Sequence, residues 1–180
     1  LLFFLCVTVF GQQKITVDEI FTGAFRAKGM DALESLKNTN QYTVLNSDKA
    51  TKSMQIDLYD FATLKKVSNL IDTKNFKELA DGIDSYKFDA SEKKILIACH
   101  SNKIFRHSFT ADYFLYDIAG KTLTKLFDVQ VQKPTFSPDG TKVIYVSKKK
   151  AGTAYATSTN TDLYEYDTKS ETPKNLTENN

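Results

Sequence analysis

Residues 135–150 read TFSPDGTKVIYVSKKK, and this stretch decides the fold class. Pro138, Asp139 and Gly140 predict a tight turn, because Pro presets φ, Asp bonds back to the backbone and Gly takes a positive φ. The run KVIYVS that follows is rich in β-branched and aromatic residues, which favour a strand. The stretch therefore predicts a turn followed by a strand that packs between neighbouring sheets.

The same pattern recurs upstream, at residues 86–101, as YKFDASEKKILIACHS. A second kind of segment ends in Tyr-Asp followed by a turn, and its Tyr residues are Tyr59, Tyr116 and Tyr166. In both series the interval is about fifty residues, the length of one four-stranded propeller blade. We predict a mostly β fold, a partial β-propeller of about three four-stranded blades with a short N-terminal helical lead-in. Such blades need further blades to cover their apolar faces.

The helical lead-in is expected within residues 13–40, and the incomplete β-propeller within 41–180. Thr16 and Glu19 have the spacing of a capping box, which predicts a short helix beginning at Val17. A second helical stretch is predicted over Met30–Lys37, because Met30, Leu33 and Leu36 fall on one helical face.

Residues 1–12 are interpreted as a truncated signal peptide. They hold an apolar run, LLFFLCVTVF, followed by Gly11 and polar residues. Val9 and Gly11 are small enough for a signal-peptidase site. The alternatives are a buried N-terminal strand or, with an upstream extension, a membrane anchor. We therefore expect an exported protein that is periplasmic, secreted or membrane-anchored.

Several kinds of chemistry are missing from the 180 residues. The net charge is +2 and the charges are scattered, so no nucleic-acid partner is expected. The glycine spacing excludes a Gly-x-Ser-x-Gly elbow, a dinucleotide fingerprint and a P-loop. His100 and His107 lack ligand-like spacing and are interpreted as structural, and Cys99 as a buried, inert strand residue. We therefore predict no cofactor, no metal site and no catalytic residue in this chain.

The carboxylates offer little more. Five aspartates stand where the predicted strand pairs end, and all five are interpreted as turn-making residues. They are Asp57, Asp60, Asp117, Asp139 and Asp167.

Residues 104–118, IFRHSFTADYFLYDI, carry the most specific motif. This run resembles the Arg-His-Ser-Tyr/Phe-Thr-Ala-x-Tyr signature in the N-terminal propeller of dipeptidyl peptidase IV-like enzymes, which are serine peptidases of the prolyl oligopeptidase family. The opening ITVDEIFTGAFRAKG resembles the start of that domain, and the likeness covers residues 15–147. Residues 148–180 look more similar to acylaminoacyl peptidases and other oligopeptidases of the same family.

The resemblance implies an eight-bladed propeller that caps a C-terminal α/β-hydrolase domain of the same polypeptide. It implies a serine exopeptidase that removes dipeptides from a peptide substrate, with Arg106 binding a substrate carbonyl; the plainer interpretation of Arg106 is a surface residue paired with a neighbouring Asp. The Ser, Asp and His of the triad would lie in the hydrolase domain, so this chain is expected to be inactive alone. A homodimer of the full-length protein is compatible with the resemblance. The adjacent glutamates with which the family recognises a substrate amino terminus do not occur in this sequence.

Two other functions fit a propeller. One is a non-catalytic periplasmic propeller that binds a protein or peptide partner, for which the repeat alone is sufficient. The other is a sugar-binding propeller, which the absence of Trp disfavours. The Arg-His-Ser run separates the peptidase from both, because a simple scaffold does not need it.

Overall fold

A computed structural model describes residues 15–26, 33–48, 50–106, 108–148 and 161–177. The chain divides into two compact units, residues 1–31 and residues 32–180, and each is described by itself. The predicted signal segment and His107 lie outside the described residues.

The first unit contains the helix α1 (Val17–Thr22). The capping box is formed as predicted: Thr16 Oγ1 accepts from the backbone N–H of Glu19 at 3.2 Å, and Glu19 Oε2 accepts from the N–H of Thr16 at 2.8 Å. Gly23, at φ 82°, ends the helix in the left-handed conformation. The helix therefore begins at Val17, where the sequence predicts it.

The second predicted helix is wrong. Leu33–Ser35 form the strand β1, which pairs with β2 (Gln41–Asp48) so that Leu33 lies opposite Val44. Short apolar runs do not distinguish a helix from a strand, and here pairing with a neighbouring strand decides the outcome. In the described residues of the lead-in there is thus a single short helix, and residues 30–32 of the second predicted helix lie outside them.

The second unit holds three four-stranded antiparallel sheets, each with its strands in chain order. The first sheet consists of β1, β2, β3 (Ser53–Asp60) and β4 (Lys66–Asp72). The second consists of β5 (Ser85–Phe88), β6 (Lys94–Phe105), β7 (Ser108–Asp117) and β8 (Thr122–Lys125). The third consists of β9 (Gln132–Phe136), β10 (Lys142–Lys148), β11 (Thr161–Asp167) and β12 (Thr172–Asn175).

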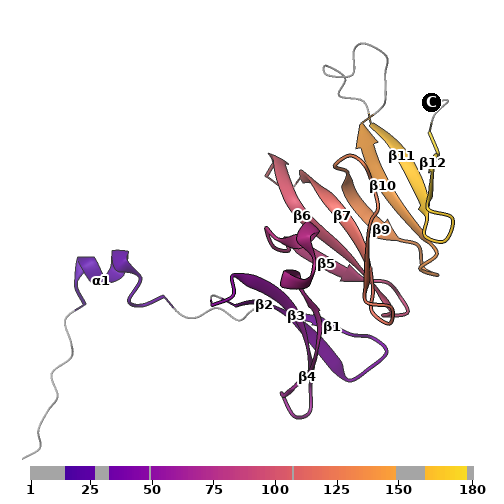
Figure 1. The fold of residues 1–180 in the computed structure, drawn as a ribbon. Helices are drawn as coiled ribbons and strands as arrows, with labels where there is room; N and C mark the ends of the chain where they lie inside the picture. The colour runs from indigo at the N-terminus through magenta and orange to yellow at the C-terminus, as the bar shows by residue number, and fades with distance from the viewer. Residues whose placement is uncertain (1–14, 27–32, 49, 107, 149–160, 178–180) are drawn as a thin grey trace, which may run out of the picture. The chain divides into compact units, whose positions relative to one another are not determined.

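The three sheets follow one another as the blades of a propeller do, and Figure 1 shows them in succession along the chain. Two short 3₁₀ helices, η1 (Thr73–Asn75) and η2 (Lys77–Leu79), connect the first sheet to the second. The predicted partial propeller of about three blades is confirmed. In the described ranges, no helix has the length and apolar run needed to span a bilayer.

The repeated turn shows why the two quoted segments resemble each other. Between β9 and β10, Asp139 accepts from the backbone N–H of Thr141 at 3.1 Å, and Gly140 has φ 70°. Between β5 and β6, Asp89 accepts from the N–H groups of Lys93 and Lys94 at 2.9 and 2.8 Å. In each case an Asp satisfies backbone donors at a turn, so the local sequence determines where the strand begins.

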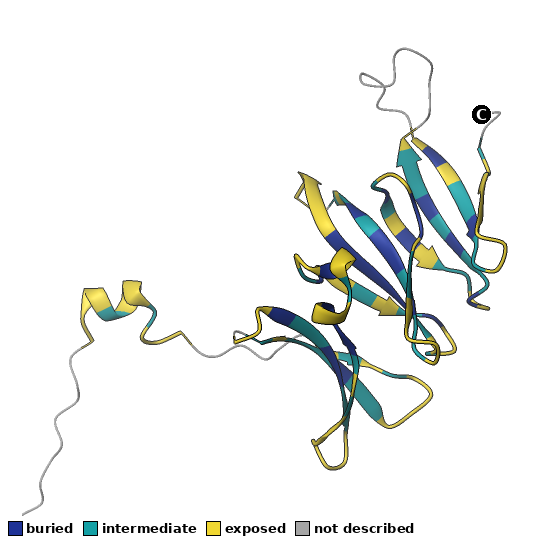
Figure 2. Ribbon diagram, viewed as in Figure 1, coloured by how far each residue is buried: buried dark blue, intermediate teal, exposed yellow. Residues whose placement is uncertain are grey.

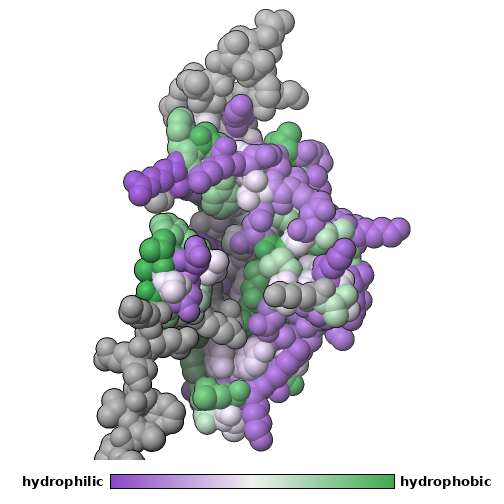
Figure 3. Space-filling model, turned by 90° about the vertical axis from the view of Figure 1, so that its left-hand side faces the viewer, coloured by the Kyte–Doolittle hydropathy of each residue, from purple (hydrophilic) through white to green (hydrophobic). Residues whose placement is uncertain are grey.

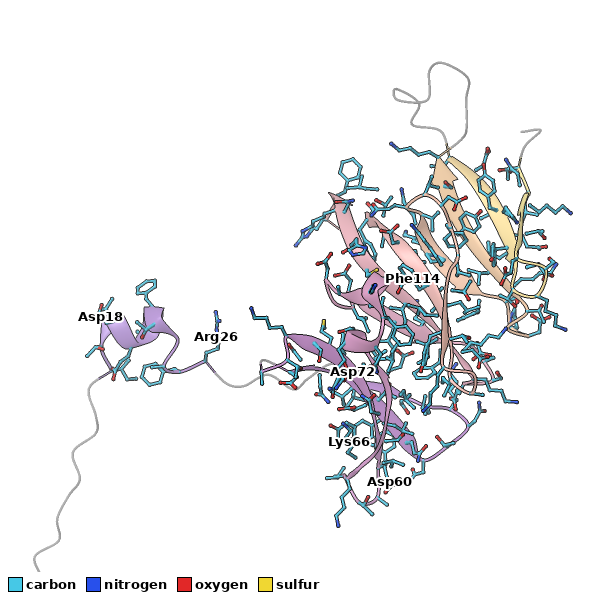
Figure 4. All side chains as sticks on the ribbon, viewed as in Figure 1. Asp18, Arg26, Asp60, Lys66, Asp72 and Phe114 are labelled. Carbon is cyan, nitrogen blue, oxygen red and sulfur yellow. The ribbon has the colours of Figure 1, made fainter. Side chains whose placement is uncertain are left out.

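Two buried clusters join the sheets. One lies between the first and second sheets and includes Ile56, Ile71, Ile97 and Phe114 (Figure 4). The other lies between the second and third sheets and includes Ala111, Val131 and Tyr145, with Phe127 packed against Tyr145 at a centroid distance of 4.1 Å. Each cluster is shared by two blades, so each blade is stabilised mainly by its neighbours.

Figure 3 shows polar side chains over much of one face, with apolar side chains between them.

Cys99 is 1% exposed, and burial, with a contribution from the nearby Asp112, raises its pKa to about 11. The thiol therefore stays protonated at neutral pH, as expected for an inert strand residue.

Candidate functional site: the arm of the second sheet

The strand β6 has two different halves. Residues 95–99 are buried, whereas every residue from His100 to Phe105 is exposed, a change that Figure 2 shows along the strand. The pairing explains this change: β5 pairs with β6 only as far as Ala98, and β8 reaches only Phe114 of β7. Residues 100–110 therefore extend from the blade as a two-stranded projection, which we call the arm.

A β-bulge marks the start of the arm. The register between β6 and β7 shifts between Cys99 and Asn102, and His100 has φ 52°. Histidine is among the residues that enter the left-handed region more readily than most. A bulge bends and twists its strand, so this one changes the direction of the arm relative to the blade.

The side chain of His100 is held by two carboxylates. Nδ1 lies 3.1 Å from Asp112 Oδ2, and Nε2 lies 3.2 Å from Asp81 Oδ2. Lys125 Nζ is 3.5 Å from the second oxygen of Asp112. His100 thus stands inside β6, where its buried part ends, and its two carboxylate contacts fit the structural role that the sequence predicts.

Arg106 lies at the far end of the arm, in the turn that follows the last ladder pair, Phe105 with Ser108. It is exposed, and it forms no ion pair with any residue that the structure describes. The plainer interpretation, a surface Arg paired with an Asp, is therefore not observed in this part of the chain.

A hollow of about 440 Å³ lies beside Arg106. Phe105 is 75% exposed and Phe109 is 39% exposed, so two aromatic rings contribute to its wall. Among the described residues, its lining consists of Ser101, Lys103, Phe105, Arg106, Ser108 and Phe109.

This arrangement combines two kinds of recognition. A guanidinium group offers up to five N–H donors in a fixed plane and keeps its charge at any working pH. Exposed phenylalanine rings offer apolar surface for a side chain. The hollow can therefore hold an extended peptide by a carbonyl or carboxylate oxygen and by an apolar group. Of the described residues, no three His, Cys, Asp or Glu side chains are grouped as a metal site.

Four of the five predicted turn aspartates are confirmed. Each accepts from backbone N–H groups of its own turn: Asp60 from Thr63, Asp117 from Gly120, Asp139 from Thr141, and Asp167 from Lys169 and Ser170.

Asp57 was predicted wrongly. It lies inside β3, only 3% exposed, and accepts from Asn46 Nδ2 at 3.0 Å and Asn69 Nδ2 at 2.8 Å. Asn46 bonds to Oδ2 and Asn69 to Oδ1, and Lys66 Nζ lies 2.7 Å from the same Oδ1 (Lys66 is labelled in Figure 4). Burial acts to raise the pKa of Asp57, but the bonds from Lys66, Asn69 and Asn46 outweigh it and hold the pKa below its usual value. Asp57 is a buried structural carboxylate rather than a turn residue.

Three consecutive four-stranded meanders with cores between them define the chain as part of a β-propeller. Residues 89–150 match the family described as the dipeptidyl peptidase IV (DPP IV) N-terminal region. The matched range contains the whole arm, including Arg106. Residues 89–150 are therefore similar to the N-terminal region of dipeptidyl peptidase IV, in agreement with the resemblance of the Arg-His-Ser signature.

Individual relatives agree. The chain is 50% identical over 42 residues to dipeptidyl-peptidase 5 of Porphyromonas endodontalis, covering 23% of this chain and 6% of the relative. It is 28% identical over 161 residues to a probable dipeptidyl-aminopeptidase B of Pyrenophora teres f. teres, covering 74% of this chain and 16% of the relative.

Solved structures show the same fold. The crystal structure of Porphyromonas gingivalis dipeptidyl peptidase 4 superposes with a TM-score of 0.73 at 24% identity, over 94% of this chain and 22% of that one. TolB from Acinetobacter baumannii superposes with a TM-score of 0.50 at 14% identity, over 81% of this chain and 32% of that one. The chain thus spans a quarter or less of the length of the peptidases that it matches. The family match ends at residue 150, and the separate resemblance of residues 148–180 stays a prediction.

Proposed function

We propose that this chain is the N-terminal propeller part of an exported serine exopeptidase of the dipeptidyl peptidase IV type. In this proposal the propeller gates access and positions the peptide N-terminus, and a C-terminal α/β-hydrolase domain of the same polypeptide supplies Ser, Asp and His. The observation that carries it is the exposed Arg106 at the end of a projecting arm, beside a hollow that can take a peptide. The names of the relatives, dipeptidyl peptidases and a dipeptidyl-aminopeptidase, support the class of reaction.

Different residues of the arm contact different parts of the peptide. Arg106 donates hydrogen bonds to a backbone carbonyl near the substrate amino terminus, so the peptide enters with a defined direction. Phe105 and Phe109 contact an apolar part of the same peptide. Holding the substrate in this way places the scissile bond for the hydrolase domain, and correct placement alone contributes strongly to rate. In this proposal, the exclusion of folded proteins is the task of the whole propeller, and the hollow of about 440 Å³ takes part of an extended peptide.

Substitution of Arg106 in the full-length enzyme tests the proposal. Arg106→Ala is expected to lower kcat/KM for a dipeptidyl p-nitroanilide with Pro or Ala before the anilide by about 10–100-fold, because hydrogen bonds to a charged group contribute about 1.5–3 kcal/mol. Arg106→Lys keeps the charge but loses the planar fork, so it is expected to recover only part of the activity.

Lys93→Ala is the matched control. Lys93 is an exposed cation just before the other end of β6, and its loss is expected to leave kcat/KM unchanged. Unchanged kinetics in Arg106→Ala would remove Arg106 from the substrate site. A full-length protein that binds peptides but hydrolyses none would instead favour the non-catalytic propeller.

A further inference from the structure

The side chain of Gln130 joins both strands of the arm. Its Oε1 accepts from Asn102 Nδ2 at 2.7 Å and from Thr110 Oγ1 at 3.1 Å. Its Nε2 donates to the backbone carbonyl of His100 at 2.9 Å. Asn102 and Thr110 lie directly opposite each other in the ladder, so one amide connects β6 to β7 just beyond the bulge.

Gln130 itself is attached to the core. The next residue, Val131, is fully buried and exchanges two backbone hydrogen bonds with Ala111 of β7, both at 3.1 Å. Ala111 is also fully buried. The amide of Gln130 therefore reaches the arm from a backbone position that is itself fixed on the blade.

The bulge explains why the arm needs this contact. A bulge leaves its extra residue without ladder partners, so backbone groups there must find others. The carbonyl of His100 is satisfied by Gln130, and the N–H of Ser101 is satisfied by Asp84 Oδ2 at 2.9 Å. Beyond these contacts the arm is a two-stranded ribbon of mostly exposed residues, and such a ribbon is only marginally stable by itself.

We propose that Gln130 is a positioning residue that fixes the direction of the arm and thereby the place of Arg106 at the substrate. This inference rests on the proposed function of Arg106. Gln130 does not line the hollow, so it acts through the arm rather than by touching the peptide. A displacement of about 1 Å in a positioning group can cost about 100-fold in rate.

Two substitutions in the full-length enzyme test the role of the amide. Gln130→Met keeps the volume and removes all three hydrogen bonds, and it is expected to lower kcat/KM by about 10-fold or more with the larger part in KM. Gln130→Glu keeps the two accepting bonds but places a carboxylate oxygen against the carbonyl of His100, so kcat/KM is expected to fall in this variant as well. Gln132→Met is the matched control, because the Gln132 side chain has no hydrogen bond to a described residue.

The double variant Arg106→Ala/Gln130→Met separates this inference from the proposed function. If Gln130 acts mainly through Arg106, Gln130→Met lowers kcat/KM clearly less in the Arg106→Ala background than in the wild type, and the remaining loss comes from the contacts of Phe105 and Phe109. Equal losses in both backgrounds would overturn the positioning role. A normal Gln130→Met enzyme beside an impaired Arg106→Ala enzyme would overturn it too, while leaving the proposed function intact.

Amide hydrogen exchange gives a readout that does not depend on turnover. In Gln130→Met the amides of residues 101–110 are expected to exchange at least about 10-fold faster than in the wild type, while those of residues 95–99 keep their rates. Unchanged exchange in the arm would refute the inference even if the enzyme proved inactive on every peptide tried. Faster exchange with unchanged kcat/KM in an active enzyme would show that the arm need not be fixed.

Discussion

Gly140→Ala tests how two blades meet at their turns. Gly140 has φ 70°, a left-handed conformation that costs an L-residue about 1–2 kcal/mol. A Cβ built there would lie 3.0 Å from Asp89 Oδ2 and 3.5 Å from Asp89 Cβ. Asp89 cannot move freely, because it is 5% exposed and accepts from the N–H groups of Lys93 and Lys94. Weakening one of these bonds adds about 1–2 kcal/mol, so a total loss of about 2–4 kcal/mol is expected.

The assay is urea-induced unfolding of the full-length protein, monitored by circular dichroism. The loss of unfolding free energy is the shift of the urea midpoint multiplied by the slope, which the substitution is expected to leave unchanged. The same substitution is made in an Asp89→Ala background, where only the backbone cost of about 1–2 kcal/mol should remain. Equal losses in the two backgrounds would show that Asp89 does not limit the space at Gly140. A total loss below about 0.5 kcal/mol would refute both parts of the reasoning, because it is what an ordinary surface substitution costs.

Two further predictions concern ionisable groups. Hydrogen bonds from Ser137 and Thr141 lower the pKa of Asp139 to about 2 in the folded protein, whereas its unfolded pKa is about 3.9. The ionised carboxylate therefore stabilises the fold at pH above about 4, and this stabilisation is lost as the pH falls from about 4 to about 2. Asp139→Ala should therefore lower the Tm of the full-length protein at pH 7 and leave it close to the wild-type Tm near pH 2. Asp128→Ala, at an exposed residue, should leave the Tm unchanged at both pH values. A Tm difference for Asp139→Ala that persists at pH 2 would argue against the carboxylate. The Cys99 thiol, with a pKa of about 11, should resist iodoacetamide in the folded protein at pH 8 and react after denaturation, as peptide mass mapping would show; rapid native labelling would contradict its burial.

The repeated blades could be predicted because their signal is local. Asp139 and Gly140 determine their own turn, and the strand after it carries its own apolar pattern. The interpretation of Leu33 failed because a three-residue strand has no period of its own and depends on its partner in β2. The interpretation of Asp57 as a turn residue failed for a related reason. Its hydrogen-bond partners Asn46 and Asn69 lie on the two flanking strands, and a linear sequence does not reveal which strands will flank it.

The candidate site was only half accessible from the sequence. Arg106 was identified through its resemblance to a family signature, since an isolated exposed Arg has no distinguishing pattern. Gln130 was missed because its partners, His100, Asn102 and Thr110, are 20 to 30 positions away. A lone Gln in a loop gives no signal before the bulge and the register of the arm are known.

The exposed half of β6 has an evolutionary consequence. The cores on both sides of the second sheet draw on β6 only up to Cys99, before the arm begins. Residues 101–109 can therefore vary in length and chemistry while the folding free energy of the blade changes little. If the arm binds peptide as proposed, its preference can diverge by mutation of one short ribbon while the scaffold that carries the ribbon stays the same.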